Sequence, residues 1–129
     1  MYTLTLKKNE EKRILLGHPW VYANEVAKIE GKDAQGSIAK VCAFDGRFIG
    51  YGYINHLSKI IVRILTRRDE IIDKDFFKKR IVNANDLRVN LGFNDNYRVC
   101  FGENDLLPGL VVDKYGDYLC VQFLTLGME

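Results

Sequence analysis

The feature that most constrains the fold is a series of short strand-like segments separated by glycine-bearing turns. Two of them, Ile38–Phe44 and Arg47–Ile54, flank Asp45-Gly46, and an Asp-Gly dipeptide between two such segments is a strong signal for a β-hairpin. Val26–Ile29 and Lys59–Leu65 have the same character. Strands this short and this closely spaced predict a small mixed-strand barrel rather than alternating strand–helix units.

Two helices are predicted outside these strands. Residues 9–16 form a short charged and apolar segment that stops at Gly17, a typical helix end. Over residues 73–91, apolar side chains recur at spacings of three to five, which predicts one apolar stripe of an amphipathic helix. Asp73 is suited to cap the start of this helix and Gly92 to end it.

The remaining strand-like segments follow the second helix. They are Tyr97–Phe101, Leu110–Val112 and Tyr118–Thr125, and the segment between the first two contains Pro108-Gly109, which predicts a fixed bend. We therefore expect a mixed α+β fold, with a barrel-like domain at residues 1–68 and part of an α/β subdomain at residues 69–129.

The distribution of charge supports a division at this point. Residues 1–68 carry 12 Lys and Arg against 6 Asp and Glu, whereas residues 69–129 carry 7 against 11. The basic half is the better candidate for binding a polyanion such as nucleic acid. The alternative is that these lysines and arginines are only a solvated surface.

Composition excludes several other classes of protein. With 47% hydrophobic and 28% charged residues the chain is expected to fold, and it contains neither a signal peptide nor an apolar run of the roughly 20 residues that a membrane span needs. The three cysteines, Cys42, Cys100 and Cys120, lie in apolar strand-like contexts. We expect reduced core thiols in a cytoplasmic protein, and no metal site.

Two motifs have both a structural and a functional interpretation. Trp20 in the segment Gly-His-Pro-Trp-Val-Tyr either anchors the helix to the sheet or offers a surface for base stacking. Gly50 and Gly52 leave one face of a strand bare, either to relieve crowding at a barrel corner or bulge, or to admit another backbone. Arg63, which alternates with apolar neighbours, is a phosphate contact or merely the solvent face of a strand.

In combination these segments resemble a known family. The order of Gly17-His18-Pro19-Trp20-Val21-Tyr22, the Asp-Gly hairpin, Gly50-Tyr51-Gly52-Tyr53-Ile54-Asn55 and Ile61-Val62-Arg63-Ile64-Leu65 is similar to the PUA domain that begins one family of large-subunit ribosomal RNA cytosine-5 methyltransferases. Residues 98–105, 107–113 and 115–117 resemble the middle segment of the same family.

This resemblance implies a protein of three parts. After the PUA domain and the middle subdomain, such a protein has a Rossmann-like domain that binds S-adenosylmethionine and carries a catalytic cysteine, whose thiolate adds to C6 of cytosine. No glycine-rich strand-to-helix turn for that cofactor is present here, so we expect this chain to be the front part of a longer protein. None of its cysteines lies in a proline-flanked loop like that of the nucleophile. No catalytic or cofactor-binding residue is assigned.

The resemblance and the charge pattern together give a predicted RNA-binding surface. PUA domains imply roles for the residues of the helix-to-strand turn and the glycine-rich strand, and charge adds the basic side chains near them. The predicted RNA-binding residues are Lys12, Arg13, Gly17, His18, Trp20, Gly50, Gly52, Lys59, Arg63, Arg67 and Arg68. We expect the partner to be RNA, of ribosomal origin, with phosphate contacts supplying affinity and stacking favouring unpaired bases.

Two other functions remain open on the sequence. PUA domains also occur in other RNA-modifying enzymes, such as pseudouridine synthases, so the chain is alternatively a stand-alone RNA-binding module. It is alternatively a protein-interaction domain that forms a homodimer through the exposed edge of the apolar segment 120–124.

An acidic loop also has two interpretations. Glu103, Asp105 and Asp113 lie around Pro108-Gly109. They either form a pair of catalytic carboxylates or, more simply, accept hydrogen bonds that fix the turns.

Overall fold

The computed structural model describes residues 1–128, which form two compact units, residues 1–70 and 71–128. The elements of unit 1 are β1 Tyr2–Leu6, α1 Lys12–Leu15, β2 Trp20–Tyr22, η1 Ala23–Glu25, β3 Val26–Glu30, β4 Ile38–Cys42, β5 Phe48–Ile54 and β6 Ile60–Thr66. The elements of unit 2 are α2 Lys74–Asn90, β7 Asn96–Phe101, η2 Gly102–Asp105, β8 Leu110–Tyr115, β9 Tyr118–Phe123 and η3 Leu126–Met128.

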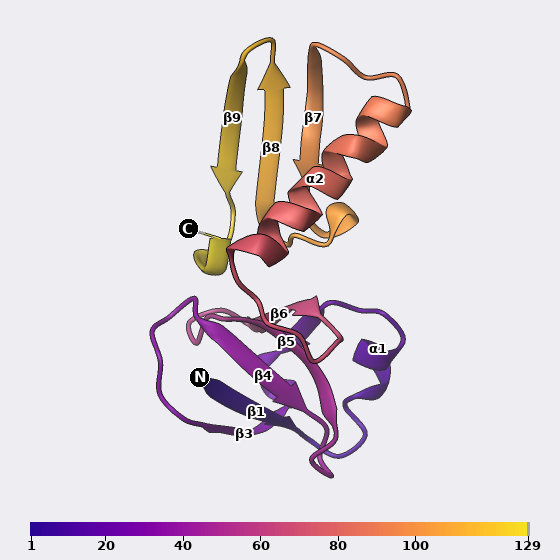
Figure 1. The fold of residues 1–129 in the computed structure, drawn as a ribbon. Helices are drawn as coiled ribbons and strands as arrows, with labels where there is room; N and C mark the ends of the chain where they lie inside the picture. The colour runs from indigo at the N-terminus through magenta and orange to yellow at the C-terminus, as the bar shows by residue number, and fades with distance from the viewer. Residues whose placement is uncertain (129) are drawn as a thin grey trace. The chain divides into compact units, whose positions relative to one another are not determined.

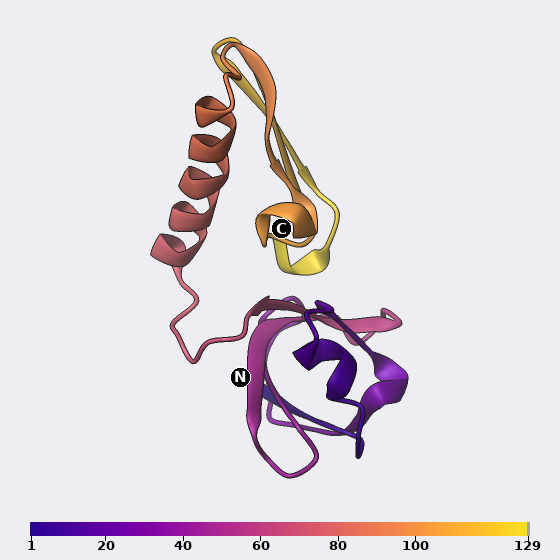
Figure 2. The same ribbon diagram turned by 90° about the vertical axis from the view of Figure 1, so that its right-hand side faces the viewer.

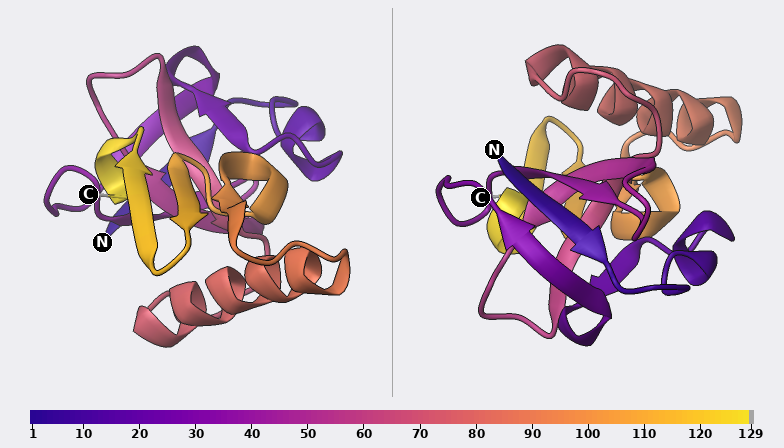
Figure 3. Two further views of the ribbon diagram at one scale, coloured as in Figure 1. Left: turned by 90° about the horizontal axis from the view of Figure 1, so that it is seen from above. Right: turned by 90° about the horizontal axis from the view of Figure 1, so that it is seen from below.

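Unit 1 is a single six-stranded sheet that curls into a partial barrel (Figures 1 and 2). The strand order is β2-β6-β5-β4-β1-β3. The pair β1–β4 is parallel and the other neighbours are antiparallel, and Figure 3 shows this part of the sheet from below. The mixed-strand barrel that the sequence predicts is therefore confirmed.

The Asp45-Gly46 turn joins β4 to β5 as predicted. Gly46 has a φ of +90°, which a residue with a side chain rarely adopts. The Ala43 N–H donates to the Arg47 carbonyl at 2.9 Å and closes the hairpin. The Asp45 carboxylate accepts from the Arg47 backbone N–H, which lowers the pKa of Asp45 below its ordinary value. The turn fixes the register of β4 and β5.

The core of unit 1 lies inside the curl. Side chains from β1, α1, β2, β4, β5 and β6 have no exposed surface. These fully buried side chains are Leu4, Leu6, Ile14, Val21, Val41, Ile54 and Val62. Ile14 is the only residue of α1 in this group, so it anchors the helix against the sheet.

Unit 2 is a three-stranded antiparallel sheet in the order β7-β8-β9, with α2 on one face (Figures 1 and 2). The Asp73 carboxylate accepts from the Phe76 N–H at 3.0 Å, and Gly92 at a φ of +96° follows the end of the helix. Both helix signals in the sequence are confirmed. The core of this unit combines Val99, Cys100, Leu107, Leu110 and Val112 with side chains of α2.

Two details differ from the sequence-based expectation. The first helix covers only Lys12–Leu15, because the chain forms turns from Lys8 onward rather than a helix from residue 9. The second strand of unit 2, β8, extends to Tyr115, beyond its expected end at Val112. The described part of the chain has no helix with the length and apolar content that crossing a membrane requires.

Candidate nucleic-acid interface

The turn between α1 and β2 positions the central residues of the predicted surface. Gly17 has a φ of +111°, and the N–H groups of Gly17 and His18 donate to the carbonyls of Ile14 and Arg13 at 3.0 and 3.2 Å. This is the Schellman pattern of helix termination. Nothing lies within 4 Å of where a Gly17 side chain would begin. Gly17 is thus required by its backbone angle and also leaves open space beside the turn.

Arg13 contacts several residues around this turn. Its guanidinium forms an ion pair with Glu25, donates to the Trp20 carbonyl at 3.0 Å and lies 2.7 Å from the His18 Nδ1. It also lies over the Tyr22 ring, with Cζ 5.0 Å from the ring centroid. Arg13 therefore binds α1 to β2 and η1, and its charge is directed at a protein carboxylate.

Glu25 is the residue of this network that the sequence did not indicate as functional. Its side chain is only 10% exposed. It accepts from both Arg13 and the Tyr22 backbone N–H, the latter at 2.9 Å. The sequence did contain a signal for Glu25. It is the only acidic residue between Glu11 and Glu30, and it lies three residues after Tyr22, the N-cap of η1, as in a capping box.

Four residues, two of which contact Arg13, form what we call the Trp20 cluster: His18, Trp20, Arg63 and Arg67. Trp20 and Arg63 are register partners of β2 and β6, and the Arg63 Cζ lies 5.3 Å from the Trp20 ring centroid. The His18 and Trp20 rings meet edge to face, 5.8 Å apart at 78°. The Arg67 guanidinium donates to the His18 carbonyl at 3.1 Å. Segments 49 residues apart thus meet at one cluster.

The other predicted basic residues lie around or away from this cluster. Lys12 is exposed on α1 next to Arg13, and Arg68 is exposed directly after Arg67. Lys59 precedes β6, whose seven residues span about 20 Å at about 3.3 Å per residue, so it lies at the opposite end of that strand from Arg67. Lys12 and Arg68 can extend the cluster, whereas Lys59 belongs to a separate part of the surface.

Gly50 and Gly52 are buried, and their bare face meets the chain's own backbone. A Cβ on Gly50 would lie 2.6 Å from the Thr66 carbonyl oxygen, and one on Gly52 would lie 2.2 Å from the Arg63 carbonyl oxygen. The register of β5 and β6 shifts between Tyr51 and Gly52, as at a bulge. The bare strand face is therefore packed against the backbone of β6.

Two carboxylates around the acidic loop of unit 2 are paired with arginines. Asp105 accepts two bonds from Arg88, each of 2.7 Å, and one from the Phe101 N–H. Burial alone would raise the pKa of Asp105, but these donors outweigh it and the pKa is lowered. Arg98 donates to Asp113 at 2.7 and 3.2 Å and lowers the pKa of that carboxyl as well. The geometry favours the structural interpretation of these two carboxylates.

The cysteines divide into two kinds. Cys42 and Cys100 are buried as expected, and burial raises the pKa of the Cys100 thiol to about 11. The expectation of a core thiol is wrong for Cys120, which is exposed. The reason is that Cys120 lies on β9, where all six residues are exposed. Residues 1–128 contain no group of His, Cys, Asp and Glu side chains placed to hold a metal ion.

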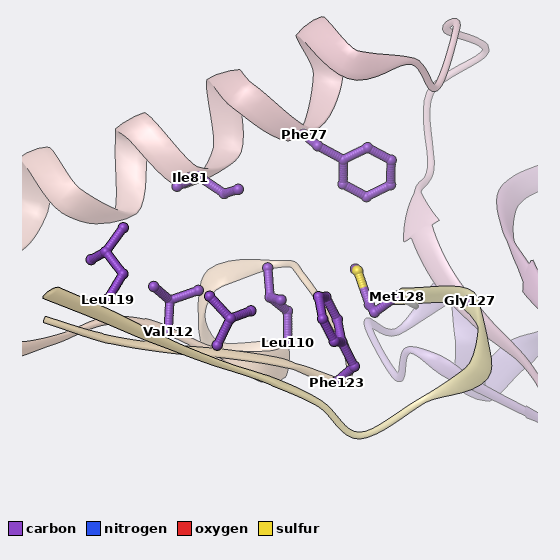
Figure 4. A pocket seen from close by; sticks show the side chains of 9 residues that line it. Phe77, Ile81, Leu110, Val112, Leu119, Phe123, Gly127 and Met128 are labelled. Atoms are coloured by element: carbon purple, nitrogen blue, oxygen red, sulfur yellow. The ribbon is translucent and has the colours of Figure 1, made fainter.

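Unit 2 also contains an apolar groove between α2 and its sheet (Figure 4). Its volume is about 490 Å³. Phe77 and Ile81 project from the helix toward Val112, Leu119 and Phe123 of β8 and β9 (Figure 4). The lining has no charged or hydrogen-bonding side chain, so it offers hydrophobic packing and no catalytic chemistry.

The curled sheet and the helix-to-strand turn define a class of domain, and residues 4–67 match the family described as PUA-like domain. These residues thus belong to the PUA-like domain family. Over nearly the whole chain there is a closer similarity to curated relatives. "Ribosomal RNA large subunit methyltransferase I" of Erwinia tasmaniensis is 39% identical over 130 residues, and the protein of the same name from Vibrio cholerae is 37% identical over 127 residues.

The alignments cover 98% and 96% of this chain but only 33% and 32% of those two relatives, so the chain spans about a third of their length. Among solved structures, a protein from Streptococcus mutans assigned as a SAM-dependent methyltransferase has the same fold, with a TM-score of 0.81 and 17% identity. A second methyltransferase structure, solved with SAH, has a TM-score of 0.82 and 17% identity. This chain covers 34% of each.

Proposed function

We propose that this chain is the RNA-binding part of a SAM-dependent methyltransferase that modifies cytosine C5 in large-subunit ribosomal RNA in the cytoplasm. Residues 1–68 hold the RNA, and residues 69–129 connect this domain to the part that carries out methyl transfer. The observation that carries the proposal is the Trp20 cluster, in which an aromatic ring and two guanidinium groups from distant segments lie together in a PUA-like domain. The names of the relatives supply the substrate class.

The chemistry of the cluster suits an unpaired stretch of RNA. Guanidinium groups bind phosphates through charge and paired hydrogen bonds, without reading sequence. An aromatic face stacks on any base and contributes about 1–3 kcal/mol per base. The Arg63 Cζ lies 5.3 Å from the Trp20 ring centroid, so the guanidinium is in contact with the ring. An unpaired nucleotide can thus place its base and its phosphate on adjacent groups.

S-adenosylmethionine would supply the methyl group, but the described residues do not fit it. A dinucleotide-type site needs a glycine-rich turn between a strand and the start of a helix. In the described part of the chain the one long helix, α2, starts at an N-cap aspartate whose carboxylate occupies the free N–H of Phe76. No step of methyl transfer is therefore assigned to these residues.

The test is binding of this chain to a single-stranded fragment of ribosomal RNA over a series of salt concentrations. The double variant Arg63→Ala/Arg67→Ala removes two cluster charges, and the matched control Lys28→Ala/Lys32→Ala removes two exposed charges from β3 and the loop after it. Loss of two phosphate contacts should reduce the slope of log K against log salt by about 1.4, at roughly 0.7 per contact for single strands.

Trp20→Ala should separately weaken binding by roughly 5- to 150-fold with no change of salt slope, because stacking is not ionic. Circular dichroism of each variant checks that the sheet is retained. Equal effects of the cluster and control variants would refute the proposed site. Binding that is absent, or independent of salt, would refute the RNA-binding function of this chain.

A second proposal concerns self-association. Within residues 1–128, β9 pairs only with β8, and its side chains include Tyr118 at 79% and Leu119 at 64% exposure. An apolar edge strand offers free backbone groups to another strand, so we propose a homodimer through β9. Sedimentation velocity should show a dimer that Gln122→Lys dissociates, because a charge on an edge strand opposes pairing. A monomer at high concentration would refute it.

A further inference from the structure

The His18 ring is held in a position that fixes its protonation pattern. Its Nδ1 lies 2.7 Å from the Nη1 of Arg13 and 3.4 Å from the Trp20 backbone N. A guanidinium has only donors and a backbone N–H is a donor. Both contacts are therefore hydrogen bonds only if Nδ1 accepts, and an accepting Nδ1 carries no proton. The imidazole is then neutral with its proton on Nε2.

The donor that imposes this pattern is itself fixed. Arg13 donates to the Trp20 carbonyl at 3.0 Å and forms its ion pair with Glu25, which is buried and also accepts from the Tyr22 N–H at 2.9 Å. Arg13 cannot turn away from His18 without losing several of these contacts. The nitrogen that accepts a bond determines where the proton resides on the other nitrogen.

All of the side-chain hydrogen bonds described for His18 involve Nδ1. The ring meets Trp20 edge to face at 5.8 Å, and the side chain is half-buried. Nε2–H is thus available at the cluster as one uncharged donor. A base stacked on or beside Trp20 would present its carbonyl oxygens or ring nitrogens within the same cluster.

We infer that Arg13 is a positioning residue that holds His18 as the Nε2–H tautomer, and that this N–H donates to an acceptor atom of an unpaired nucleotide next to Trp20. The inference rests on the proposed RNA-binding function. It adds a preference that arginines alone do not supply, because a neutral donor on a fixed ring selects an acceptor at one place. Arg13 contributes through His18 rather than by contacting a phosphate.

The first measurement is the tautomer of His18 in the free protein, from its ring ¹⁵N chemical shifts. The chain has two histidines, so the signals are assigned with the variant His18→Gln. We expect a pyridine-type shift at Nδ1 and a pyrrole-type shift at Nε2. In Arg13→Met, which keeps the apolar stem and removes the donor, the two shifts should move toward each other as the tautomers mix. A protonated Nδ1 in the wild-type protein would overturn the inference whatever the RNA does.

The second measurement is RNA affinity. His18→Phe, which keeps a ring and removes the donor, should weaken binding by about 5- to 10-fold, the typical effect of one net hydrogen bond, without changing the salt slope. His18→Gln, whose amide nitrogen takes the place of Nε2, should restore most of the affinity. If Arg63→Ala/Arg67→Ala weakens binding but His18→Phe does not, the inference fails and the proposed function stands. If no variant and no wild-type protein binds RNA, both fail.

Discussion

Replacing Gly52 with alanine should destabilise unit 1 more than replacing Gly46, a glycine of the same domain that has open space around it. The new Cβ would lie 2.2 Å from the carbonyl oxygen of Arg63 and 2.8 Å from its carbon, where real contacts are essentially never under 3.0 Å. To bring the 2.2 Å contact up to 3.0 Å, strands β5 and β6 must separate by at least roughly 0.8 Å at this point. Overpacking typically costs about 1–3 kcal/mol and each weakened ladder bond about 1 kcal/mol.

We therefore expect a loss of about 3 kcal/mol for Gly52→Ala. The matched control is Gly46→Ala, where nothing lies within 4 Å and only the φ of +90° opposes a side chain, at about 1–2 kcal/mol. The assay is urea unfolding followed by tryptophan fluorescence. Since Trp20 is the only tryptophan and lies in unit 1, the signal reports this unit alone.

With a slope of about 1 kcal/mol per molar urea for so small a unit, the midpoint should fall by about 3 M for Gly52→Ala and by about 1–2 M for the control. A midpoint for Gly52→Ala no lower than that of Gly46→Ala would refute the reasoning. If Gly52→Ala folded normally and lost only RNA affinity, the glycine would be admitting RNA rather than β6, contrary to the position described here.

Three other predictions have defined outcomes. In the native protein only the exposed Cys120 should react with a thiol reagent at pH 8, whereas all three thiols should react in denaturant; two or more fast native thiols would contradict the burial seen here. Asp105→Asn should lower the stability of unit 2 by about 3 kcal/mol, because it leaves the Arg88 guanidinium without its paired carboxylate. The pKa of Asp105 is lowered in the fold, so its contribution is complete above the ordinary value of 3.8 and is lost as the pH falls through the folded pKa; acid titration of unit 2 by circular dichroism should show a smaller loss of stability in the variant than in the wild type. Asp73→Ala should cost about 1 kcal/mol through loss of the N-cap, measured by thermal unfolding, and an unchanged midpoint would count against that cap.

Local signals in the sequence predicted the local structure well. The Asp45-Gly46 hairpin and the long helix between Asp73 and Gly92 form as expected. These features depend on residues within a few positions of one another, where turn chemistry and helix capping act. The mixed α+β fold was predicted for the same reason, together with the resemblance to a known family.

Contacts between distant segments were beyond such signals. Nothing in Tyr2–Leu6 indicates that it pairs in parallel with Ile38–Cys42 and antiparallel with Val26–Glu30. The same limit applied to the candidate site, because the sequence shows the charge of Arg13 but not that Glu25 and His18 take up its hydrogen bonds. The same limit applied to the burial of Cys120. The apolar sequence around it predicts a buried strand, but the strand lies at the edge of its sheet and remains exposed.

The strand pairing of unit 1 has a consequence for biosynthesis. All of its pairs are complete once Thr66 has left the ribosome, because β6 is the last strand that any of them requires. Translation adds about 5–20 residues per second, and small β-rich domains fold in roughly milliseconds to seconds. We therefore expect the strand pairs of unit 1 to form on the nascent chain without any residue of unit 2.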